Sequence, residues 1–207
     1  MNRTADVVIV GAGVIGSATA FELAKRGYKT LNIDKLPASG YGSTSNSCAI
    51  VRAHYSTWDG VAMAYEGFFY WDDWNKYLEV EDERGMAKYM KTGSIMFMLK
   101  GADHSKKSLN LFKEIGVEHE IWDLETLKKK MPIYSHDSYN GTSRPDEDDS
   151  FFDKSGDQIE GAVWTPGSGY VSDPQLATHN LQVATEAKGG EFLFDSEITE
   201  IRQIGRA

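Results

Sequence analysis

Three glycines spaced as GxGxxG lie near the start of the chain, in the sequence GAGVIG at residues 11–16. In a dinucleotide-binding turn, the first glycine permits the tight turn, the second lets the backbone approach a pyrophosphate, and the third allows a helix to pack closely on a strand. The unpaired N–H groups and the partial positive charge at the start of that helix then stabilise the anion. Glycine-rich turns are common, so the pattern has this meaning only between a strand and a helix.

Asp34 is a further residue whose type and position indicate a nucleotide. It lies 18 positions after Gly16, at the end of the next apolar run. A carboxylate at that place accepts hydrogen bonds from ribose hydroxyl groups, and its charge repels a 2′-phosphate, which disfavours an NADP-type ligand. The alternative is a carboxylate that only ends a strand or stabilises a turn.

The elements that must position these residues are indicated by the flanking sequence. Residues Asp6–Val10 form a β-branched run typical of a buried strand, Val14–Arg26 favour a helix, and Tyr28–Ile33 return to a strand pattern. This order predicts a βαβ unit with two parallel strands and a right-handed crossover. In that context the glycine pattern is a strong signal for nucleotide binding.

A polar loop, Pro37–Asn46, follows where an NAD-type domain would continue with a second crossover helix and a third parallel strand. Its Gly, Ser and Thr residues can donate backbone and hydroxyl hydrogen bonds to the second phosphate and the ribityl chain of a flavin dinucleotide. The loop therefore favours FAD over NAD, and an NAD-dependent dehydrogenase is the weaker alternative.

Further elements are predicted along the rest of the chain from periodicity and from helix-ending residues. The aromatic residues of the first of them are expected to pack in a core. The predicted elements are an amphipathic helix over Val61–Tyr77, a strand or hairpin over Tyr89–Leu99, helices over Ser105–Ile115, Leu124–Met131 and Pro174–Lys188, and strands over Gly161–Trp164, Gly190–Phe194 and Glu197–Ile201.

Composition excludes some classes of protein. The 207 residues carry 22 Lys and Arg against 31 Asp and Glu, a net charge of −9, which argues against a general nucleic-acid binder. Seven acids lie from Arg144 to Glu160, and we interpret this stretch as a solvated loop, because it lacks the spacing and the glycine of an EF-hand loop. No metal site is predicted.

The single cysteine, Cys48, excludes an intrachain disulfide and a cysteine-based zinc site, and we expect a small buried thiol. Its isolation favours a reducing, cytoplasmic compartment. The uncharged run Val7–Phe21 is short and contains glycines, so no membrane span is predicted.

Two long stretches carry a family resemblance. VVIVGAGVIGSATAFELAKRGYKTLNIDK at residues 7–35 and GSTSNSCAIVRAHYS at residues 42–56 resemble the D-amino acid oxidase superfamily of FAD-dependent oxidoreductases, most closely its sarcosine oxidase and dimethylglycine dehydrogenase branch. The resemblance implies an α/β fold, with a Rossmann-like FAD-binding domain and a second, antiparallel-sheet substrate domain that is incomplete in this chain. It assigns residues 1–85 and 164–207 to the FAD-binding domain and residues 86–163 to part of the substrate domain.

The same resemblance implies residues that contact FAD. The pyrophosphate would be contacted by the turn of Gly11, Gly13, Val14, Ile15 and Gly16, and the adenosine ribose by Asp34 and Lys35. The second phosphate and the ribityl chain would be contacted by the loop of Gly42, Ser43, Thr44, Ser45 and Asn46. The adenine would be contacted by the backbone of Ile198. Asn46 stands where the dimethylglycine dehydrogenase branch has the histidine that carries a covalent flavin. The cysteine that attaches flavin in sarcosine oxidases belongs to a C-terminal half that this sequence does not contain. FAD is therefore expected to bind without a covalent bond to Asn46.

Two residues are candidates for catalysis by the same resemblance. Arg52 matches the arginine that binds the substrate carboxylate in sarcosine oxidases, and its alternative role is an ion pair at the surface or beside the flavin. Ala49 stands where those oxidases have a further basic residue, which alters the charge expected near the flavin. His54 could transfer a proton near neutral pH, and its alternative role is structural.

The implied function is oxidation of the C–N bond of a small secondary or tertiary amine, or of an amino acid, by hydride transfer to FAD. An FAD-dependent hydroxy-acid or glycerol-3-phosphate dehydrogenase is an alternative, because it would share every N-terminal motif. A flavin-binding subunit without its own catalysis is another. Since members of the family are much longer, either a missing C-terminal half or a second chain is expected to complete the site.

Overall fold

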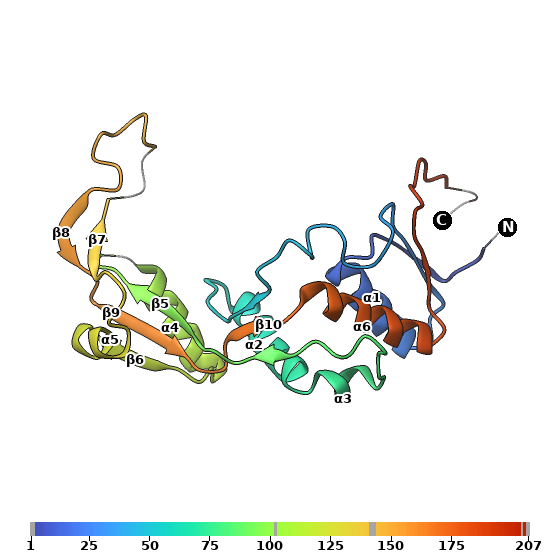
Figure 1. Cartoon of the computed structure of the whole chain (residues 1–207), viewed down its shortest axis with the longest axis horizontal. Helices are drawn as coiled ribbons and strands as arrows, with labels where there is room; N and C mark the ends of the chain where they lie inside the picture. Colours follow the sequence, from blue (N-terminus) through green and yellow to red (C-terminus); the bar gives the residue numbers. More distant parts are fainter. Residues whose placement is uncertain (1–2, 102, 141–143, 204, 206–207) are drawn as a thin grey trace. The chain divides into compact units, whose positions relative to one another are not determined.

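The computed structural model describes residues 3–101, 103–140, 144–203 and 205, and the chain divides into two compact units (Figure 1). Unit 1 comprises Met1–Ile50, Phe69–Met90 and Tyr170–Ala207, and unit 2 comprises Val51–Phe68 and Lys91–Gly169. These units are divisions by contact, so assigning one to a cofactor and the other to a substrate stays a prediction.

Unit 1 contains a parallel sheet of three strands, β1 (Val7–Val10), β2 (Thr30–Ile33) and β11 (Glu191–Leu193), in the order β1-β2-β11. In the register of β1 and β2, Val7 lies opposite Thr30. The central strand β2 is the most buried, as expected for a strand with a neighbour on each side. The predicted βαβ unit is confirmed.

Two helices pack against each other in unit 1, α1 (Val14–Lys25) and α6 (Pro174–Ala187) (Figure 1). Small residues on their buried faces, among them Ala20 and Ala184, let the backbones approach closely. The start of α6 is fixed by Asp173, whose carboxylate accepts the N–H groups of Gln175 and Leu176, each at 2.9 Å. Both predicted helices are confirmed to within one residue.

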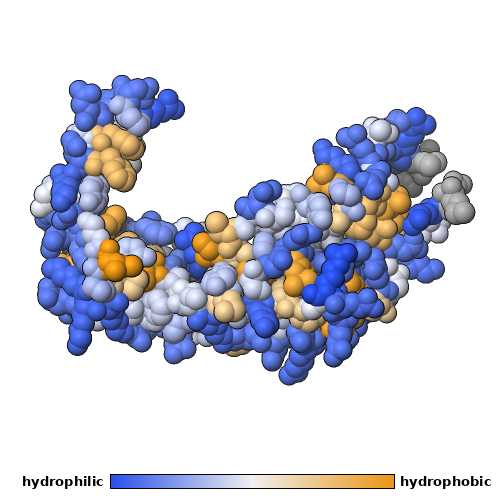
Figure 2. All heavy atoms as spheres, viewed as in Figure 1, coloured by the Kyte–Doolittle hydropathy of each residue, from blue (hydrophilic) through white to orange (hydrophobic). Residues whose placement is uncertain are grey.

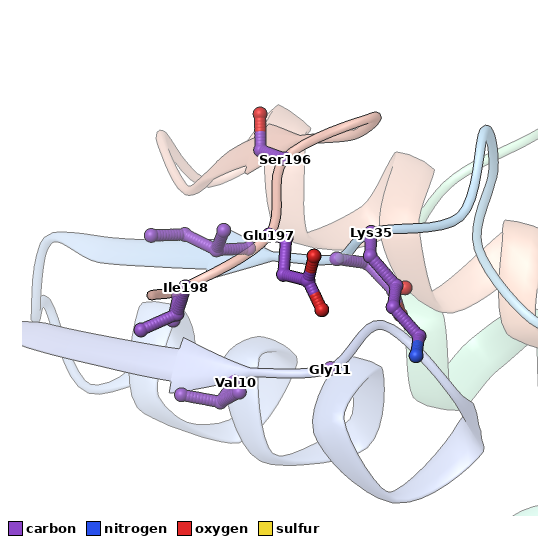
Figure 3. A pocket seen from close by; sticks show the side chains of 8 residues that line it. Val10, Gly11, Lys35, Ser196, Glu197 and Ile198 are labelled. Carbon is purple, nitrogen blue, oxygen red and sulfur yellow. The ribbon is translucent and has the colours of Figure 1, made fainter. Parts of the chain in front are cut away.

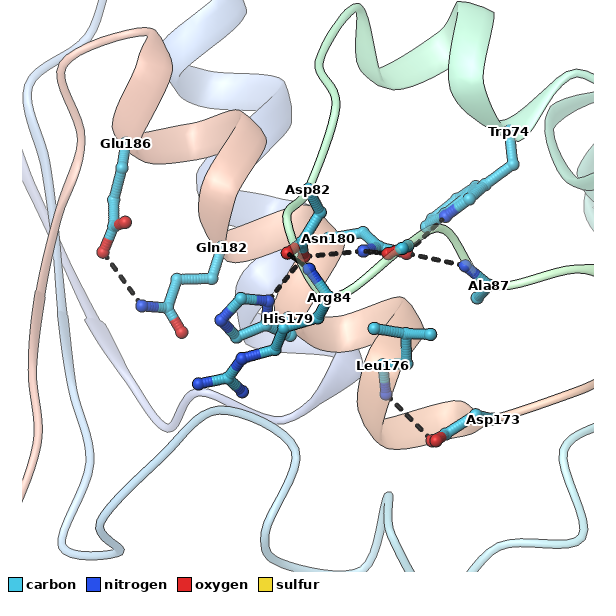
Figure 4. A network of polar contacts seen from close by, with 11 residues as sticks. Trp74, Asp82, Arg84, Ala87, Asp173, Leu176, His179, Asn180, Gln182 and Glu186 are labelled. Carbon is cyan, nitrogen blue, oxygen red and sulfur yellow. Dashed lines mark hydrogen bonds and ion pairs between the residues drawn. The ribbon is translucent and has the colours of Figure 1, made fainter.

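A polar network fixes the loop before β4 (Tyr89–Met90) onto α6 (Figure 4). The buried Asp82 carboxylate lies 2.5 Å from His179 Nδ1 and accepts the side-chain amide of Asn180 at 2.8 Å. The amide oxygen of Asn180 accepts from Ala87 N at 2.9 Å. Burial raises the pKa of Asp82, but the hydrogen bonds from Arg84 N, His179 and Asn180 outweigh it and hold the pKa below its usual value.

The other elements of unit 1 are short. Helix α3 (Trp74–Leu78) precedes the loop, and β10 (Gly169–Val171) pairs antiparallel with β4, placing Tyr170 opposite Met90. These strands belong to a sheet of order β3-β10-β4, in which β3 is Ile50–Val51.

Unit 2 contains an antiparallel sheet of β5 (Ser94–Met98), β9 (Gly161–Thr165) and β6 (Glu120–Asp123), in the order β5-β9-β6. Helices α4 (Asp103–Ile115) and α5 (Leu124–Lys130) also belong to it. Its main core cluster consists of Ala53, Val61, Phe68, Met96, Phe112, Val117 and Val163.

An exposed hairpin extends from unit 2. It pairs β7 (Asp137–Tyr139) with β8 (Lys154–Gln158), and every residue of β8 is exposed. The interpretation of the acidic stretch from Arg144 as a loop is wrong for β8, because its backbone pairs antiparallel with β7, and an ion pair from Lys154 to Asp137 at 2.6 Å also joins the two strands. Figure 2 shows that the outer end of this hairpin is hydrophilic.

Three predicted elements differ from the structure. The helix predicted over Val61–Tyr77 is two helices, α2 (Trp58–Asp72) and α3, because Asp73 has non-helical backbone angles. The segment Tyr89–Leu99 is no hairpin, since β4 and β5 belong to different sheets. Residues 197–201 form no strand, because no described strand pairs with them.

Two side chains have a different exposure from that expected. Cys48 is exposed, so the prediction of a buried thiol is wrong. Trp71 is only half-buried, whereas Phe68 and Trp74 are buried as predicted, because only one face of α2 meets a core. No helix in the described ranges is long and apolar enough to cross a bilayer.

Candidate cofactor-binding site

The glycine turn joins β1 to α1 in unit 1, as the sequence predicts. Gly11 has a φ of +102°, a conformation that side chains other than glycine rarely adopt, and its N–H donates to Ile33 O at 2.8 Å. At Gly16 an added Cβ would lie 2.1 Å from Gly11 O, so helix and turn meet at a distance that only glycine allows. The start of α1 has no acidic residue in its first turn and therefore suits an anion.

Asp34, at the end of β2, is hydrogen-bonded to this turn. One carboxylate oxygen accepts Ala12 N at 2.7 Å, and the other accepts Leu36 N at 2.9 Å. Each oxygen keeps a second lone pair, so the group can also accept a hydrogen bond from a ligand. The structure thus places Asp34 beside the glycine turn with acceptor capacity left for a ligand. Its contact with a ribose stays a prediction.

Asn32 is a site residue that the sequence reasoning missed. It is fully buried in β2, and its side-chain amide donates to Gly16 O at 3.2 Å and to Gly11 O at 3.4 Å. It therefore holds the first and the third glycine of the turn together. An amide at a buried strand position could have indicated it, since a buried polar group needs partners.

The polar loop lies against the glycine turn through Thr44. The Thr44 hydroxyl accepts Val14 N at 3.1 Å, and an added Cβ at Gly13 would lie 3.2 Å from the same oxygen. A groove of about 360 Å³ is lined by Ser43 and Thr44 from the loop and by residues of β1, the turn and α1. The lining of this groove includes all five residues that the sequence analysis assigns to the pyrophosphate turn, Gly11, Gly13, Val14, Ile15 and Gly16.

A second pocket, of about 280 Å³, also includes Val10 and Gly11 in its lining (Figure 3). We call it the adenosine pocket, after the part of a dinucleotide that the sequence analysis predicts there. Its lining is Val10, Gly11, Ile33, Asp34, Lys35, Ser196, Glu197 and Ile198. It brings together the predicted Asp34, Lys35 and Ile198, and it adds Ser196 and Glu197, which the sequence reasoning did not select.

Three of the predicted loop residues lie apart from both pockets. The Ser45 hydroxyl and the Asn46 amide both donate to Gly42 O, at 3.0 and 3.1 Å, so the loop turns back on itself there. Neither Gly42, Ser45 nor Asn46 lines the groove or the adenosine pocket. Their predicted contacts with FAD stay predictions.

The two predicted catalytic residues belong to unit 2 and differ in exposure. Arg52 is exposed, whereas His54 is only 8% exposed. His54 Nε2 lies 2.9 Å from the Thr165 hydroxyl and 3.5 Å from that of Ser94. Its ring also lies 5.7 Å from that of Phe112. His54 is therefore a buried, hydrogen-bonded histidine.

Burial, together with the charges of Arg52 and His104, lowers the pKa of His54 to about 4. The imidazole is therefore neutral in the folded protein at neutral pH.

This pKa predicts a pH-dependent stability. The unfolded histidine binds a proton below about 6.5, while the folded one does not until about 4, so the stabilisation is present above pH 6.5 and is lost as the pH falls through this window. The free energy of unfolding should fall by up to about 3 kcal/mol from this group. Urea unfolding at several pH values should show a shallower dependence for the His54→Asn variant than for the wild type.

Gly67→Ala is the control for this experiment, because it changes no titratable group and its added Cβ would meet no atom within 4 Å. It should keep the wild-type pH dependence. Equal slopes for the wild type and for His54→Asn would contradict the lowered pKa.

Nearly the whole chain resembles known proteins. Residues 6–207 match the FAD dependent oxidoreductase family. The monomeric sarcosine oxidase of Streptomyces avermitilis is 26% identical over 200 residues, which are 96% of this chain and 45% of that protein.

Two solved structures share the fold. The L-proline dehydrogenase from P. horikoshii is similar with a TM-score of 0.73 at 21% identity, over 96% of this chain and 46% of that chain. The glycine oxidase from Geobacillus kaustophilus is similar with a TM-score of 0.69 at 23% identity, over 96% and 48%. The α/β class with an antiparallel second sheet is confirmed, and the chain spans less than half the length of these three relatives.

Proposed function

This chain belongs to the FAD dependent oxidoreductase family, and from that premise we propose that unit 1 binds FAD without a covalent bond and that the protein oxidises the C–N bond of a small amine or amino acid. The observation that carries the proposal is a pair of pockets that share Val10 and Gly11, where β1 enters the glycine turn. A dinucleotide has the same layout, with a nucleoside on one side of its pyrophosphate.

The residues present fit this cofactor. Residues 13, 15 and 16 would offer backbone N–H groups at the start of α1 to the pyrophosphate, whereas Val14 N already donates to the Thr44 hydroxyl. Asp34 and Lys35 would hold the ribose, and the backbone of Ile198 the adenine, because all three line the adenosine pocket. Ser43 and Thr44 would hold the second phosphate and the ribityl chain from the groove. When bound, FAD supplies the acceptor for a hydride from the carbon beside the substrate nitrogen.

Non-covalent binding is supported by the chemistry of Asn46. A carboxamide is not a nucleophile, and its nitrogen already donates to Gly42 O. Gly42, Ser45 and Asn46 would act by shaping the loop that presents Ser43 and Thr44.

The substrate class is supported by Arg52 and by the names of the relatives. A guanidinium can pair with both oxygens of a carboxylate, and Arg52 is exposed in unit 2, where a substrate could reach it. Sarcosine, L-proline and glycine, the amino acids named in the relatives above, all carry a carboxylate beside the carbon that bears nitrogen. His54, neutral at pH 7, would contribute by packing and hydrogen bonding rather than as a general acid.

The test is an absorption spectrum of the purified protein after incubation with FAD and removal of free cofactor, before and after acid precipitation. We expect flavin bands that pass entirely into the supernatant. Anaerobic addition of sarcosine, dimethylglycine or L-proline should then bleach the bands, and glycerol 3-phosphate should not. The Arg52→Gln variant should require more amino acid for the same bleaching.

Each other outcome has a distinct meaning. Flavin that stays with the precipitate would contradict the non-covalent proposal. Bleaching by glycerol 3-phosphate alone would favour the hydroxy-acid alternative. Bound FAD that no amine bleaches would favour a flavin-binding subunit whose catalysis needs further chain.

A further inference from the structure

Two carboxylates line the adenosine pocket, although a ribose needs only one. Asp34 comes from the end of β2, and Glu197 comes from the segment after β11. Figure 3 shows that the side chain of Glu197 extends toward Gly11 and that the side chain of Lys35 lies to one side of it. With one cation against two anions, the side chains of this pocket carry a net negative charge.

The two carboxylates differ in how they are engaged. Both oxygens of Asp34 accept backbone N–H groups, so a large part of its charge is already compensated within the turn. Glu197 makes no hydrogen bond or ion pair with any other residue in the described part of the chain. Its carboxylate is therefore free to accept a hydrogen bond from a ligand in the pocket that it lines.

Backbone hydrogen bonds hold Glu197 in this place. Ser196 N donates to Asp34 O at 3.0 Å, and Asp195 N donates to Leu36 O at 3.2 Å. The segment that carries Glu197 is thus bonded to the end of β2, immediately beside Asp34 and Lys35. A change of its side chain should leave the backbone of the pocket intact.

We propose that Glu197 determines specificity at the adenosine end, by selecting a ribose with a free 2′-hydroxyl and rejecting a 2′-phosphate. This inference rests on the proposed function. A carboxylate accepts a hydrogen bond from a hydroxyl group, whereas a phosphate monoester has about two negative charges at neutral pH and repels it. Lys35 can offset only one of these charges.

The test compares adenosine diphosphate ribose with its 2′-phosphate as competitors that displace FAD from the full chain, followed by flavin fluorescence anisotropy. We expect the wild type to prefer the unphosphorylated competitor by about a hundredfold, and Glu197→Gln to reduce this preference about tenfold, as loss of one short-range charge repulsion would. Glu197→Lys should reduce it further. Glu200→Gln, the same change on a residue of that segment that lines neither pocket, should keep the wild-type preference.

The outcomes separate this inference from the proposed function. If the wild type binds FAD and Glu197→Gln keeps the preference of the wild type within twofold, Glu197 does not determine the specificity. If the wild type binds neither FAD nor adenosine diphosphate ribose, the proposed function fails, and this inference fails with it. Circular dichroism of each variant should match the wild type, because Glu197 is exposed.

Discussion

Gly16→Ala is expected to weaken FAD binding by at least about a hundredfold, or about 3 kcal/mol. The added Cβ would lie 2.1 Å from Gly11 O and 3.5 Å from the Ile9 side chain. Backbone cannot yield as a flexible side chain can, so α1 must move away from β1 and carry its N–H groups out of position. Titration of FAD fluorescence with the purified variant measures the loss.

Gly67→Ala is the matched control. Gly67 also lies in a helix, α2, but an added Cβ there would meet no atom within 4 Å. We expect its FAD affinity to equal that of the wild type and its helix to be slightly more stable. A Gly16→Ala variant with wild-type affinity would mean that close packing of α1 on the turn is not needed for the cofactor.

A folding defect is distinguished from a binding defect by the thermal unfolding midpoint of each variant without FAD. The steric conflict at Gly16 is local to unit 1, so the antiparallel sheet of unit 2 should keep its circular dichroism signal. The less severe Gly13→Ala variant, whose Cβ would lie 3.2 Å from the Thr44 hydroxyl, should fold and still lose affinity.

Asp34→Ala is expected to give the second largest effect, a loss of FAD affinity of about thirtyfold to a hundredfold, or 2 to 3 kcal/mol. The change leaves the N–H groups of Ala12 and Leu36 without their acceptors and removes the proposed ribose contact. Because Ala12 belongs to the glycine turn, the loss should act on the pyrophosphate as well as on the ribose. Calorimetric titration with FAD and with ADP measures both.

Two variants serve as controls for Asp34. Asp6→Ala removes a carboxylate that also accepts a backbone N–H, from Lys29 at 2.8 Å, but at the opposite end of the sheet. It should lower stability without changing FAD affinity. Asp34→Asn keeps one acceptor oxygen and should be intermediate. If Asp34→Ala and Asp6→Ala behaved alike in FAD binding, Asp34 would be a structural residue only.

Much of unit 1 could be predicted because its signals are local. The run of residues 6–34 contains a strand, a glycine turn, a helix and a second strand, and each is specified by residue types within a few positions. Glycine is required at position 11 by a positive φ and at position 16 by close contact with Gly11 O, and the GxGxxG spacing predicts both requirements. The family resemblance resides in the same contiguous stretches, so it could be stated from the sequence.

The boundaries of later elements were harder to predict, because they depend on neighbours that are distant in the chain. Gly93 has a φ of +72°, and an added Cβ there would lie 1.9 Å from the ring of Trp164, a residue 71 positions away. On either side of Gly93 the chain has different partners, since β4 pairs with β10 and β5 pairs with β9. The apolar pattern of residues 197–201 could not reveal that no strand lies beside them.

The sequence by itself determined the βαβ unit, the glycine turn, Asp34 and the family, because these follow from spacing within some thirty residues. Only the tertiary structure decided which side chains complete the site. Thr44 reaches the start of α1, Asn32 holds Gly11 and Gly16 together, and the segment with Glu197 is bonded beside Asp34. It also decided that His54 is buried and neutral while Cys48 is exposed. The physical reason is that hydrogen-bond partners and burial are set by packing between segments, which residue types along one segment do not specify.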